Sequence, residues 1–439
     1  MRDFATSDHP GVAAQLARLG ALTLPEGRLG LEIIHALLGA LGDPQHRLPP
    51  VFHVAGTNGK GSTCAYLRAM LEAQGLRVHS ATKPHLVRYN ERIRIAGELI
   101  SDEALANLLE RVLDAAEGLG ADYAPSFFEV TTAALLLAFA ENPADACVIE
   151  VGLGGRLDAT NVFTRPAACG IATLGIDHEA FLLRPEEGAP EEPLTRIAFE
   201  KAGIARKDSP LVTQPYPYHA AAEVKRIAAA AGAPLFMRGE GWDAAIAETI
   251  AYRDEQGDLT LPLPTLVGLH QAENAALAVA MLRHQSAVIV SPEAMAKGIR
   301  RAKWPARLQR LGKGPLTELA GRREIWLDGG HNPDAGLAIA RHFAHHAPVH
   351  LVLGMLANKD PAALLKPLSD CLISVSVVPA PGHDAHRPED FAGHTTLPVA
   401  AFPDVAQAIA ALPPEGDVLI AGSLYLAGEV LRLNREFPD

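Results

Sequence analysis

The sequence is poor in cysteine. The 439 residues include only four cysteines, at Cys64, Cys147, Cys169 and Cys371, and no two of them form a C-x-x-C pair. This scatter disfavours a disulfide framework and a zinc site, and it is typical of proteins in a reducing cytosol.

Long hydrophobic runs are also missing. The longest unbroken apolar run, Ala133 to Ala140, is far shorter than the roughly 18–20 residues that cross a bilayer. The opening residues, Met1-Arg2-Asp3-Phe4, lack the basic and then apolar pattern of a secretory signal. We therefore expect a cytoplasmic protein with no membrane partner.

Positive charge is scarce relative to negative charge. Lys and Arg total 39 against 51 Asp and Glu, a formal net charge of −12. This balance disfavours nonspecific binding to nucleic acid or to anionic membranes, because both attract basic surfaces. Anionic small substrates remain compatible with it, provided that their site is locally positive.

The chain is long and apolar enough for more than one folded core. Hydrophobic residues make up 48% and charged residues 21% of the 439 positions, and domains average about 150 residues. Apolar strand-like runs alternate with helical patterns, which is typical of parallel sheets covered on both faces. The predicted strands are 51–55, 77–82, 146–151 and 169–176, with a hairpin over 91–100; the predicted helices are 29–41, 59–74, 127–140 and one that begins at Asp102 with Ser101 as its cap.

The alternation restarts near residue 304. Strands are predicted at 325–327, 349–353, 373–378 and 418–421, with a helix over 333–346. The sequence therefore predicts an α/β protein with a parallel-sheet domain over 1–295, a linker at 296–305 within the broader segment 286–305, and a smaller α/β domain over 306–439.

A glycine-rich segment follows the strand 51–55. It reads Gly56, Thr57, Asn58, Gly59, Lys60, Gly61, Ser62, Thr63, and a helix comes after it. Such a turn points backbone N–H groups at phosphate oxygens, and the helix N-terminus and Lys60 add positive charge. The segment differs from the Walker A pattern at two positions. Val54 occupies the position of the first glycine, and Gly61 rather than Ser or Thr follows the lysine. The order strand, loop and helix still predicts a phosphate site.

Four further blocks make the chain recognisable. They are Pro-His-Leu-Val-Arg-Tyr-Asn-Glu-Arg-Ile at 84–93, Glu-Val-Gly-Leu-Gly-Gly-Arg-Leu-Asp-Ala-Thr-Asn at 150–161, Glu-Lys-Ala-Gly-Ile at 200–204 and Leu-Asp-Gly-Gly-His-Asn-Pro at 327–333. Together with the phosphate loop, they resemble the folylpolyglutamate synthase/dihydrofolate synthase family of the Mur ligase superfamily. The resemblance implies a P-loop ATPase-type domain followed by a smaller, Rossmann-like glutamate-ligase domain.

The resemblance implies an ATP-dependent amide ligase. A carboxylate of dihydropteroate or a reduced folate would attack the γ-phosphate of ATP, and L-glutamate would then attack the acyl phosphate. Other Mur-type amide ligases, such as a peptidoglycan ligase, and a member with an impaired metal site remain alternatives. A P-loop motor is disfavoured because no strand ends in a convincing Walker B Asp. The family resemblance implies a monomer.

The resemblance also assigns catalytic and metal-binding residues. Phosphoryl transfer needs Mg²⁺, which prefers oxygen ligands. Glu150 and His178 correspond to metal ligands of the family, and Lys60 to its phosphate lysine. Lys201 corresponds to a lysine that is carbamylated in members of the family. From the sequence alone, Glu150 can also be an ion-pair partner, His178 a structural residue and Lys201 an ordinary cation at a helix C-terminus.

Nucleotide contacts are implied beyond the phosphate loop. Asn274 corresponds to an asparagine on the adenine side, and Arg307 to an arginine that reaches ATP phosphate. Asp328 would hold the ribose or orient Arg307. His331 beside it would line the glutamate side. The alternative for Arg307 is a surface charge.

The folate substrate is implied to bind near two segments. Ser126, Phe127, Phe128 and Glu129 would supply aromatic stacking and an acceptor, and Leu157 and Asp158 would lie near the same place. The alternative for the two phenylalanines is core packing.

One position departs from the family pattern. Where the family has a serine that binds Mg²⁺, this chain has Lys83, and a protonated lysine cannot be a metal ligand. Three alternatives follow: Lys83 neutralises phosphate directly, Thr82 or Ser62 takes over ligation, or the site is impaired. A change of Lys83 to Ser is therefore predicted to alter the Mg²⁺ dependence.

Two other segments are given structural interpretations. His342, His345 and His346 resemble a metal cluster, but their Ala-rich helix predicts a solvated face. The acidic, proline-rich stretch 184–193 is predicted to be a solvated surface insertion.

Overall fold

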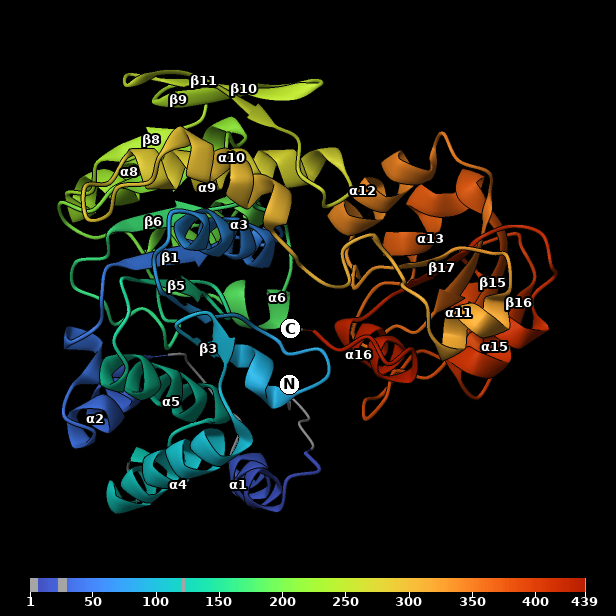
Figure 1. Ribbon diagram of the computed structural model, residues 1–439, viewed down its shortest axis with the longest axis horizontal. Helices are drawn as coiled ribbons and strands as arrows, with labels where there is room; N and C mark the ends of the chain where they lie inside the picture. Colours follow the sequence, from blue (N-terminus) through green and yellow to red (C-terminus); the bar gives the residue numbers. More distant parts are fainter. Residues whose placement is uncertain (1–6, 23–29, 121–122, 439) are drawn as a thin grey trace. The chain divides into compact units, whose positions relative to one another are not determined.

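The computed structural model describes residues 7–22, 30–120 and 123–438. The chain divides into two units (Figure 1). Unit 1 consists of Met1–Lys83, Arg88–Thr265 and Gln271–Ala302, and unit 2 of Pro84–Val87, Leu266–His270 and Lys303–Asp439. Each unit has its own sheet and its own hydrophobic cores.

Unit 1 is built on an eight-stranded sheet with the order β4-β3-β2-β5-β1-β6-β7-β8. The six strands from β2 to β8 in this order are parallel, whereas β3 and β4 form an antiparallel edge. The bounds are β1 (Val51–Ala55), β2 (Val78–Ala81), β3 (Ile93–Ile95), β4 (Glu98–Leu99), β5 (Ala146–Glu150), β6 (Ala168–Ile171), β7 (Leu211–Thr213) and β8 (Leu235–Met237). A second, antiparallel sheet contains β9 (Trp242–Ile246), β10 (Thr249–Asp254) and β11 (Gly257–Pro262).

Helices cover both faces of the large sheet, as its fully buried strands require. Figure 1 shows α5 on one side and α3 with α10 on the other. The helix bounds are α1 (Pro10–Ala21), α2 (Glu32–Ala40), α3 (Lys60–Ala73), α4 (Asp102–Gly118), α5 (Phe127–Glu141), α6 (Glu179–Leu182), α7 (Pro193–Ala202), α8 (Tyr218–Ala231), α9 (Leu269–Arg283) and α10 (Pro292–Arg301). None of the described helices is long and apolar enough to span a membrane.

Unit 2 repeats the layered arrangement on a smaller scale. Its six-stranded sheet has the order β12-β13-β17-β14-β15-β16, and only β12 is antiparallel to its neighbour. The strands are β12 (Gln309–Arg310), β13 (Ile325–Leu327), β14 (Val349–Leu353), β15 (Leu372–Val377), β16 (Val399–Ala401) and β17 (Val418–Ala421). The helices are α11 (Pro315–Ala320), α12 (Pro333–Phe343), α13 (Ala362–Leu368), α14 (Pro388–Ala392), α15 (Val405–Ala411) and α16 (Leu424–Leu433).

Most predicted elements are confirmed. The hairpin is β3 and β4 joined at Ala96 and Gly97, which both have positive φ. The helix at Asp102 is α4, and the Ser101 hydroxyl accepts from the N–H of Ala104 at 3.2 Å. The helix predicted over 29–41 is α2, and residue 29 lies outside the described residues.

Two boundaries differ from the prediction. The strand predicted over 169–176 ends at Ile171, because Thr173 leaves the sheet to pair with Asn58. The first part of the predicted linker 296–305 is helical, because α10 extends to Arg301. This helix belongs to unit 1, and unit 2 resumes at Lys303. The sheet of β9, β10 and β11 was not predicted from the sequence.

Candidate active site

The phosphate loop connects β1 to α3, and two of its glycines are required by geometry. Gly56 and Gly59 have φ values of 148° and 84°. A Cβ atom at Gly56 would lie 2.9 Å from that of Ala172, and one at Gly59 would collide with the Asn274 side-chain oxygen. The loop lies so close to Ala172 and Asn274 that neither position tolerates a side chain.

A set of hydrogen bonds clamps this loop to the segment after β6. The N–H of Thr57 donates to the Thr173 carbonyl at 2.8 Å, and its hydroxyl donates to the Gly175 carbonyl at 2.7 Å. The N–H of Gly175 also lies 3.0 Å from the Thr57 hydroxyl. The side chain of Thr57 is therefore used to shape the loop rather than left for a ligand.

Two lysine side chains converge on one carbonyl of the loop. The Lys60 ammonium donates to the carbonyl of Gly56 at 2.9 Å and to that of Thr57 at 3.2 Å. The Lys201 ammonium, from the end of α7, donates to the same Gly56 carbonyl at 2.9 Å. The structure thus brings the side-chain nitrogens of two predicted catalytic residues to the same carbonyl of the loop.

The environment of Lys201 favours its neutral amine. The side chain is buried, and burial, together with the charge of Lys60, lowers its pKa from 10.5 to about 7. A neutral amine is the form that reacts with carbon dioxide. The modification of Lys201 stays a prediction.

Glu150 ends β5 and is buried, with 4% of its surface exposed. Its Oε2 accepts a hydrogen bond from the backbone N–H of Lys83 at 3.1 Å. The Lys83 ammonium lies 3.4 Å from the hydroxyl of Thr132 in α5. Lys83 therefore connects the end of β5 to α5, a role that was not predicted from the sequence.

Oxygen donors suited to Mg²⁺ are present beside the loop. Glu150 offers a buried carboxylate, and the buried Thr63 hydroxyl at the start of α3 has no hydrogen-bond partner in the described part of the chain. His178 precedes α6 with φ of 56°, and its side chain is 40% exposed. No group of three or more His, Cys, Asp or Glu side chains within residues 7–22, 30–120 and 123–438 is arranged to hold a metal. A metal here would need further oxygens, such as those of a nucleotide.

Asp158 organises the loop that follows β5. Its Oδ1 accepts from the N–H of Thr160 at 2.9 Å and from its hydroxyl at 2.5 Å, and its Oδ2 accepts from the N–H of Leu153 at 2.8 Å. Burial opposes ionisation of Asp158, but Lys83 and these hydrogen bonds leave its pKa lowered. The carboxylate is thus largely used within its own loop; the neighbouring Leu157 is partly buried. The substrate roles of both residues stay predictions.

The predicted substrate segment 126–129 begins α5. The N–H of Ser126 donates to Glu129 Oε2 at 2.7 Å in a capping box. Phe127 is buried in the core and contacts Tyr89 with ring centres 6.4 Å apart, whereas Phe128 is only partly buried. The core-packing alternative thus describes Phe127, and Phe128 is the aromatic ring of the pair that remains partly accessible.

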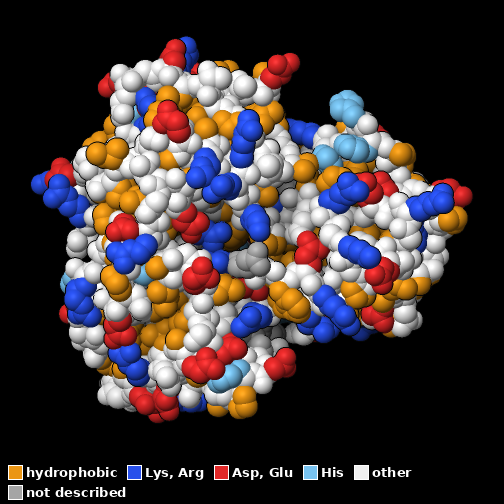
Figure 2. Space-filling model, viewed as in Figure 1, with side chains coloured by type: hydrophobic (Ala, Val, Ile, Leu, Met, Phe, Trp, Pro, Cys, Tyr) orange, Lys and Arg blue, Asp and Glu red, His pale blue; other side chains and the backbone are white. Residues whose placement is uncertain are grey.

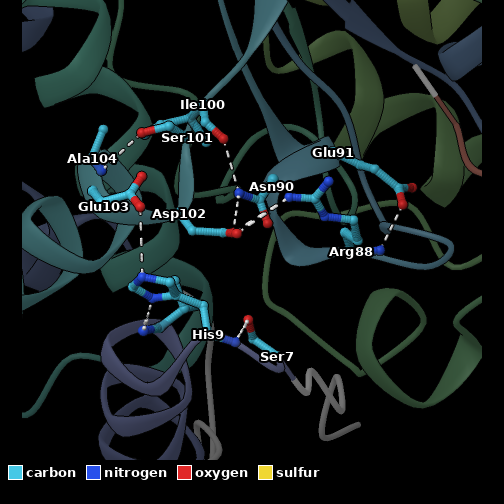
Figure 3. A network of polar contacts seen from close by, with 11 residues as sticks. Ser7, His9, Arg88, Asn90, Glu91, Ile100, Ser101, Asp102, Glu103 and Ala104 are labelled. Atoms are coloured by element: carbon cyan, nitrogen blue, oxygen red, sulfur yellow. Dashed lines mark hydrogen bonds and ion pairs between the residues drawn. The ribbon is translucent and has the colours of Figure 1, made fainter.

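Polar residues of the block 84–93 bind the end of the β3–β4 hairpin and the start of α4 (Figure 3). The Asn90 amide donates to the Ile100 carbonyl at 2.8 Å and to Asp102 Oδ1 at 2.9 Å. Arg88 forms an ion pair with Asp102 at 3.4 Å, and its N–H donates to Glu91 Oε1 at 2.6 Å. This part of the block is a structural support.

In unit 2, Asp328 holds the backbone around Arg307. Its Oδ2 accepts from the N–H of Leu308 at 2.8 Å and its Oδ1 from that of Gly330 at 2.7 Å. Ala306 and Leu308, on both sides of Arg307, have positive φ values of 55° and 44°. Burial raises the pKa of Asp328 although Arg307 opposes this. Asp328 therefore fixes the backbone next to Arg307, which is what orienting Arg307 requires. The roles of both residues toward ATP stay predictions.

Three further predicted residues have identifiable surroundings. Asn274 is buried in α9 against Gly59, so its side chain supports the phosphate loop; its adenine role stays a prediction. In unit 2, His331 lies with Nδ1 3.3 Å from the Gly329 carbonyl. Gly61 and Ser62 are buried in the first turn of α3.

The histidines of unit 2 form an aromatic cluster. The rings of His342 and His346 have centres 4.5 Å apart, and His342 packs on Trp326 at 4.9 Å. Figure 2 shows histidine side chains at the surface over the end of α12. His345 and His346 are exposed and His342 is only half-buried, so the predicted solvated face is confirmed for two of the three.

A cavity of about 710 Å³ lies elsewhere in unit 1. Its lining includes Pro50, Ala167 and Pro210, which come directly before β1, β6 and β7. The phosphate loop follows the opposite end of β1. This cavity therefore contains none of the predicted site residues.

Two features of the site were not predicted from the sequence. The first is the clamp at Thr173–Gly175; the one sequence feature that could have indicated it is the glycine shortly after a buried strand. The second is a group of four charged residues around α7. Its signal was the spacing of Arg196 and Glu200, which places both on one face of that helix.

The comparisons with known proteins agree with one another. No family model matches the chain. It is 35% identical to folylpolyglutamate synthase of Lacticaseibacillus casei, over 90% of this chain and 92% of that protein. It is 33% identical to dihydrofolate synthase/folylpolyglutamate synthase of Escherichia coli, over 95% and 93%.

Solved structures extend this similarity. Escherichia coli FolC in complex with DHPP and ADP matches with a TM-score of 0.81 and 31% identity, covering 96% of this chain and 97% of that one. The bifunctional folylpolyglutamate synthase/dihydrofolate synthase with Mn, AMPPNP and L-glutamate bound matches with a TM-score of 0.80 and 33% identity, covering 96% and 97%.

Proposed function

The chain belongs to the folylpolyglutamate synthase/dihydrofolate synthase family, and we propose that it joins L-glutamate to the carboxylate of dihydropteroate, of a reduced folate, or of both. ATP and a divalent metal ion serve the reaction, as the complexes of its structural relatives with ADP, AMPPNP and Mn support. The single observation that carries the proposal is the pair of lysines, Lys60 and Lys201, on the Gly56 carbonyl of a phosphate loop.

The reaction has two balanced steps. A carboxylate oxygen of the acceptor attacks the γ-phosphorus of ATP, the bond to the β-phosphate oxygen breaks, and ADP leaves. The amine of glutamate then attacks the acyl carbon, phosphate leaves with the bonding electrons, and the amine loses a proton. Because negative charge develops on oxygen atoms in both steps, positioned positive groups are the main requirement.

Lys60 is the group best placed to meet the phosphates. It folds back on the carbonyls of Gly56 and Thr57, and a phosphate oxygen offers a charged acceptor in place of these neutral ones. Release of Lys60 would leave the Gly56 carbonyl to Lys201. The clamp at Thr57 keeps the loop in shape during this exchange.

The metal would be held by Glu150, with His178 as a further ligand. A bound Mg²⁺ neutralises charge on the transferred phosphoryl group. We also propose that Lys201 adds carbon dioxide, forming an N–C bond and releasing one proton, so that a carboxylate stands where the amine was. The lowered pKa of Lys201 supports this step.

The other expectations are proposals of the same kind. Phe128 would contact the acceptor, and Arg307 and Asp328 would serve the nucleotide. The assignment of residues 306–439 to glutamate ligation, a monomeric state and a cytoplasmic location are likewise proposed. The location rests on the four cysteines, which are all buried and free.

Phosphate release from ATP tests the function. The chain would be mixed with ATP, Mg²⁺ and glutamate, and with dihydropteroate or tetrahydrofolate, and the products would be identified by mass. Turnover with both acceptors indicates a bifunctional enzyme, and turnover with one assigns a single activity. Absence of turnover with both would contradict the proposal.

A further inference from the structure

Four charged side chains form a compact group beside the phosphate site. Arg156 follows the glycines of the β5 loop, Glu186 lies in the acidic stretch between α6 and α7, and Arg196 and Glu200 share one face of α7. Their side chains are only 23%, 19%, 6% and 6% exposed, in the order given. We call these residues the arginine–glutamate group.

Each arginine contacts both glutamates. Arg156 Nη2 lies 2.6 Å from Glu186 and 2.9 Å from Glu200, and Arg196 Nη2 lies 2.8 Å and 3.1 Å from the same two carboxylates. Both guanidinium groups also lie over the ring of Phe199, at 4.8 Å and 5.3 Å. Two positive and two negative charges thus balance in a place with little water.

The arginine–glutamate group joins three segments that carry candidate site residues. Arg156 belongs to the loop that contains Asp158, and its N–H donates to the Glu200 carbonyl at 2.7 Å. Arg196 Nε donates to the Leu182 carbonyl at 3.1 Å, which ties down the helix that begins after His178. Lys201 directly follows Glu200.

Helix α7 packs so closely on the loop after β5 that neither can shift without a steric clash. A Cβ atom at Gly155 would lie 2.9 Å from the Glu200 carbonyl oxygen and 3.0 Å from that of Lys201, and one at Gly203 would collide with Arg156. A rotation or slide of α7 would therefore move Lys201 away from the Gly56 carbonyl. The orientation of α7 decides where the Lys201 nitrogen lies.

Glu186 is the only member of the arginine–glutamate group that comes from the acidic stretch. Its Oε2 accepts from both arginines, so it completes the link between them. This contradicts the prediction that residues 184–193 are simply a solvated insertion. Glu192 is also engaged, because its carboxylate accepts from the N–H groups of Leu194 and Thr195 and caps α7.

We propose that Glu186 is a positioning residue for the ligase reaction: through Arg156 and Arg196 it fixes α7, and with it Lys201, against the β5 loop. The inference rests on the proposed function, in which Lys201 and this loop serve catalysis. Without the Glu186 carboxylate, two guanidinium groups would share one partner and repel each other, and α7 would lose one of its supports.

The test compares Glu186→Gln with Glu187→Gln in the full chain. Glu187 is the exposed neighbour, so its variant removes the same charge from the same loop without touching the arginine–glutamate group. We expect kcat of Glu186→Gln to fall about 10–100-fold, because small displacements of reacting groups have effects of this size. The Glu187→Gln variant should keep the kcat of the unchanged protein.

Hydrogen exchange supplies a readout that needs no activity. Glu186→Gln should exchange faster over residues 193–203 and 152–158, with α8 unchanged. Glu186→Asp keeps the charge on a shorter side chain, so its loss of kcat should be smaller than that of Glu186→Gln. If Glu186→Gln fails to fold, Glu186→Asp carries the test, with a roughly 3–10-fold loss of kcat and faster exchange in the same two segments.

Equal kcat and equal exchange in Glu186→Gln and Glu187→Gln would overturn the inference. So would a lower melting temperature with unchanged kcat, since that result assigns Glu186 a purely structural role. An unchanged protein without turnover on either acceptor would instead contradict the proposed function, while the exchange data would still decide whether Glu186 holds α7.

Discussion

The phosphate loop of unit 1 and the Arg307 turn of unit 2 both contain residues with positive φ, but the residue types differ. At the phosphate loop, positive φ falls on Gly56 and Gly59, where it carries no strain. At the Arg307 turn it falls on Ala306 and Leu308, where each such residue costs about 1 kcal/mol or more. The first loop is shaped by its own glycines and the second is held by Asp328.

The difference shows which kinds of site can be recognised from a sequence. The glycines that permit a turn can be identified directly in the sequence, so the phosphate loop can be recognised from the sequence alone. A turn in which the N–H of Leu308 donates to a distant carboxylate leaves no such trace. Asp328 lies 20 positions from Leu308 in the chain.

The largest expected effect tests the charge of the phosphate loop. Lys60→Met should lower kcat about 10²–10³-fold, because it removes a positive group from the transferred phosphate. The unfolding midpoint should change little, since the bonds lost are those to two carbonyls of its own loop. Steady-state kinetics and urea unfolding measure both. Lys207→Met, at an exposed position of unit 1, is the control. A kcat within threefold of the unchanged protein would show that Lys60 does not serve the reaction.

The next effect concerns the strained turn. Asp328→Asn should lower the free energy of unfolding by about 2–3 kcal/mol, because an amide NH₂ would face a backbone N–H that Asp328 now satisfies. Urea unfolding measures this, with the exposed Asp384→Asn as control. If Asp328→Asn unfolds with the same free energy as Asp384→Asn, Asp328 does not hold the turn.

The limits of sequence reasoning follow the same division. The strand β1, the phosphate loop and the start of α3 were predictable, because the glycines and the lysine of the loop mark them in the sequence. The end of β6 was not, since Thr173 leaves the sheet for a partner more than a hundred positions away at the phosphate loop. The surroundings of Lys201 depend in the same way on Arg156 and Glu186, which approach α7 from other segments.

Residue type alone does not reveal the structural work of a polar group. Glu129 and Asp158 were predicted to meet a substrate, which stays a prediction, and in the structure the first caps α5 and the second accepts three hydrogen bonds from its own loop. Acidic side chains at the starts of helices and in tight loops commonly bind the backbone. Only the partner atoms in the structure separate these uses.

A smaller effect concerns pH and the buried Lys201. Its pKa is lowered from 10.5 to about 7, chiefly by burial, so between these values the unfolded chain holds more protons than the folded one. The free energy of unfolding should therefore rise with pH across this window, by up to about 1.4 kcal/mol per pH unit. Below about pH 7 the cost of burying a charged amine is fully present.

Lys201→Met isolates this contribution. We expect the rise in unfolding free energy between pH 7 and pH 9 to be smaller in the variant by about 1–2 kcal/mol. Urea unfolding at both pH values measures it. Lys207→Met, at an exposed position, should keep the full rise. The same slope in all three proteins would mean that Lys201 is not the group that titrates.

The smallest effect we predict concerns Lys83, which connects the end of β5 to α5. Its backbone N–H contacts Glu150, whereas its ammonium meets Thr132 in α5. Lys83→Ser replaces a cation beside the proposed metal ligand by a hydroxyl that can bind a metal. The Mg²⁺ concentration for half-maximal activity should therefore fall at least about threefold, because a hydroxyl adds a donor and the loss of a positive charge favours a cation. A Mg²⁺ titration at saturating ATP measures the change, and Lys207→Ser should leave it unaltered. An unchanged titration in Lys83→Ser would place Lys83 outside the phosphate and metal site and leave it a structural link between β5 and α5.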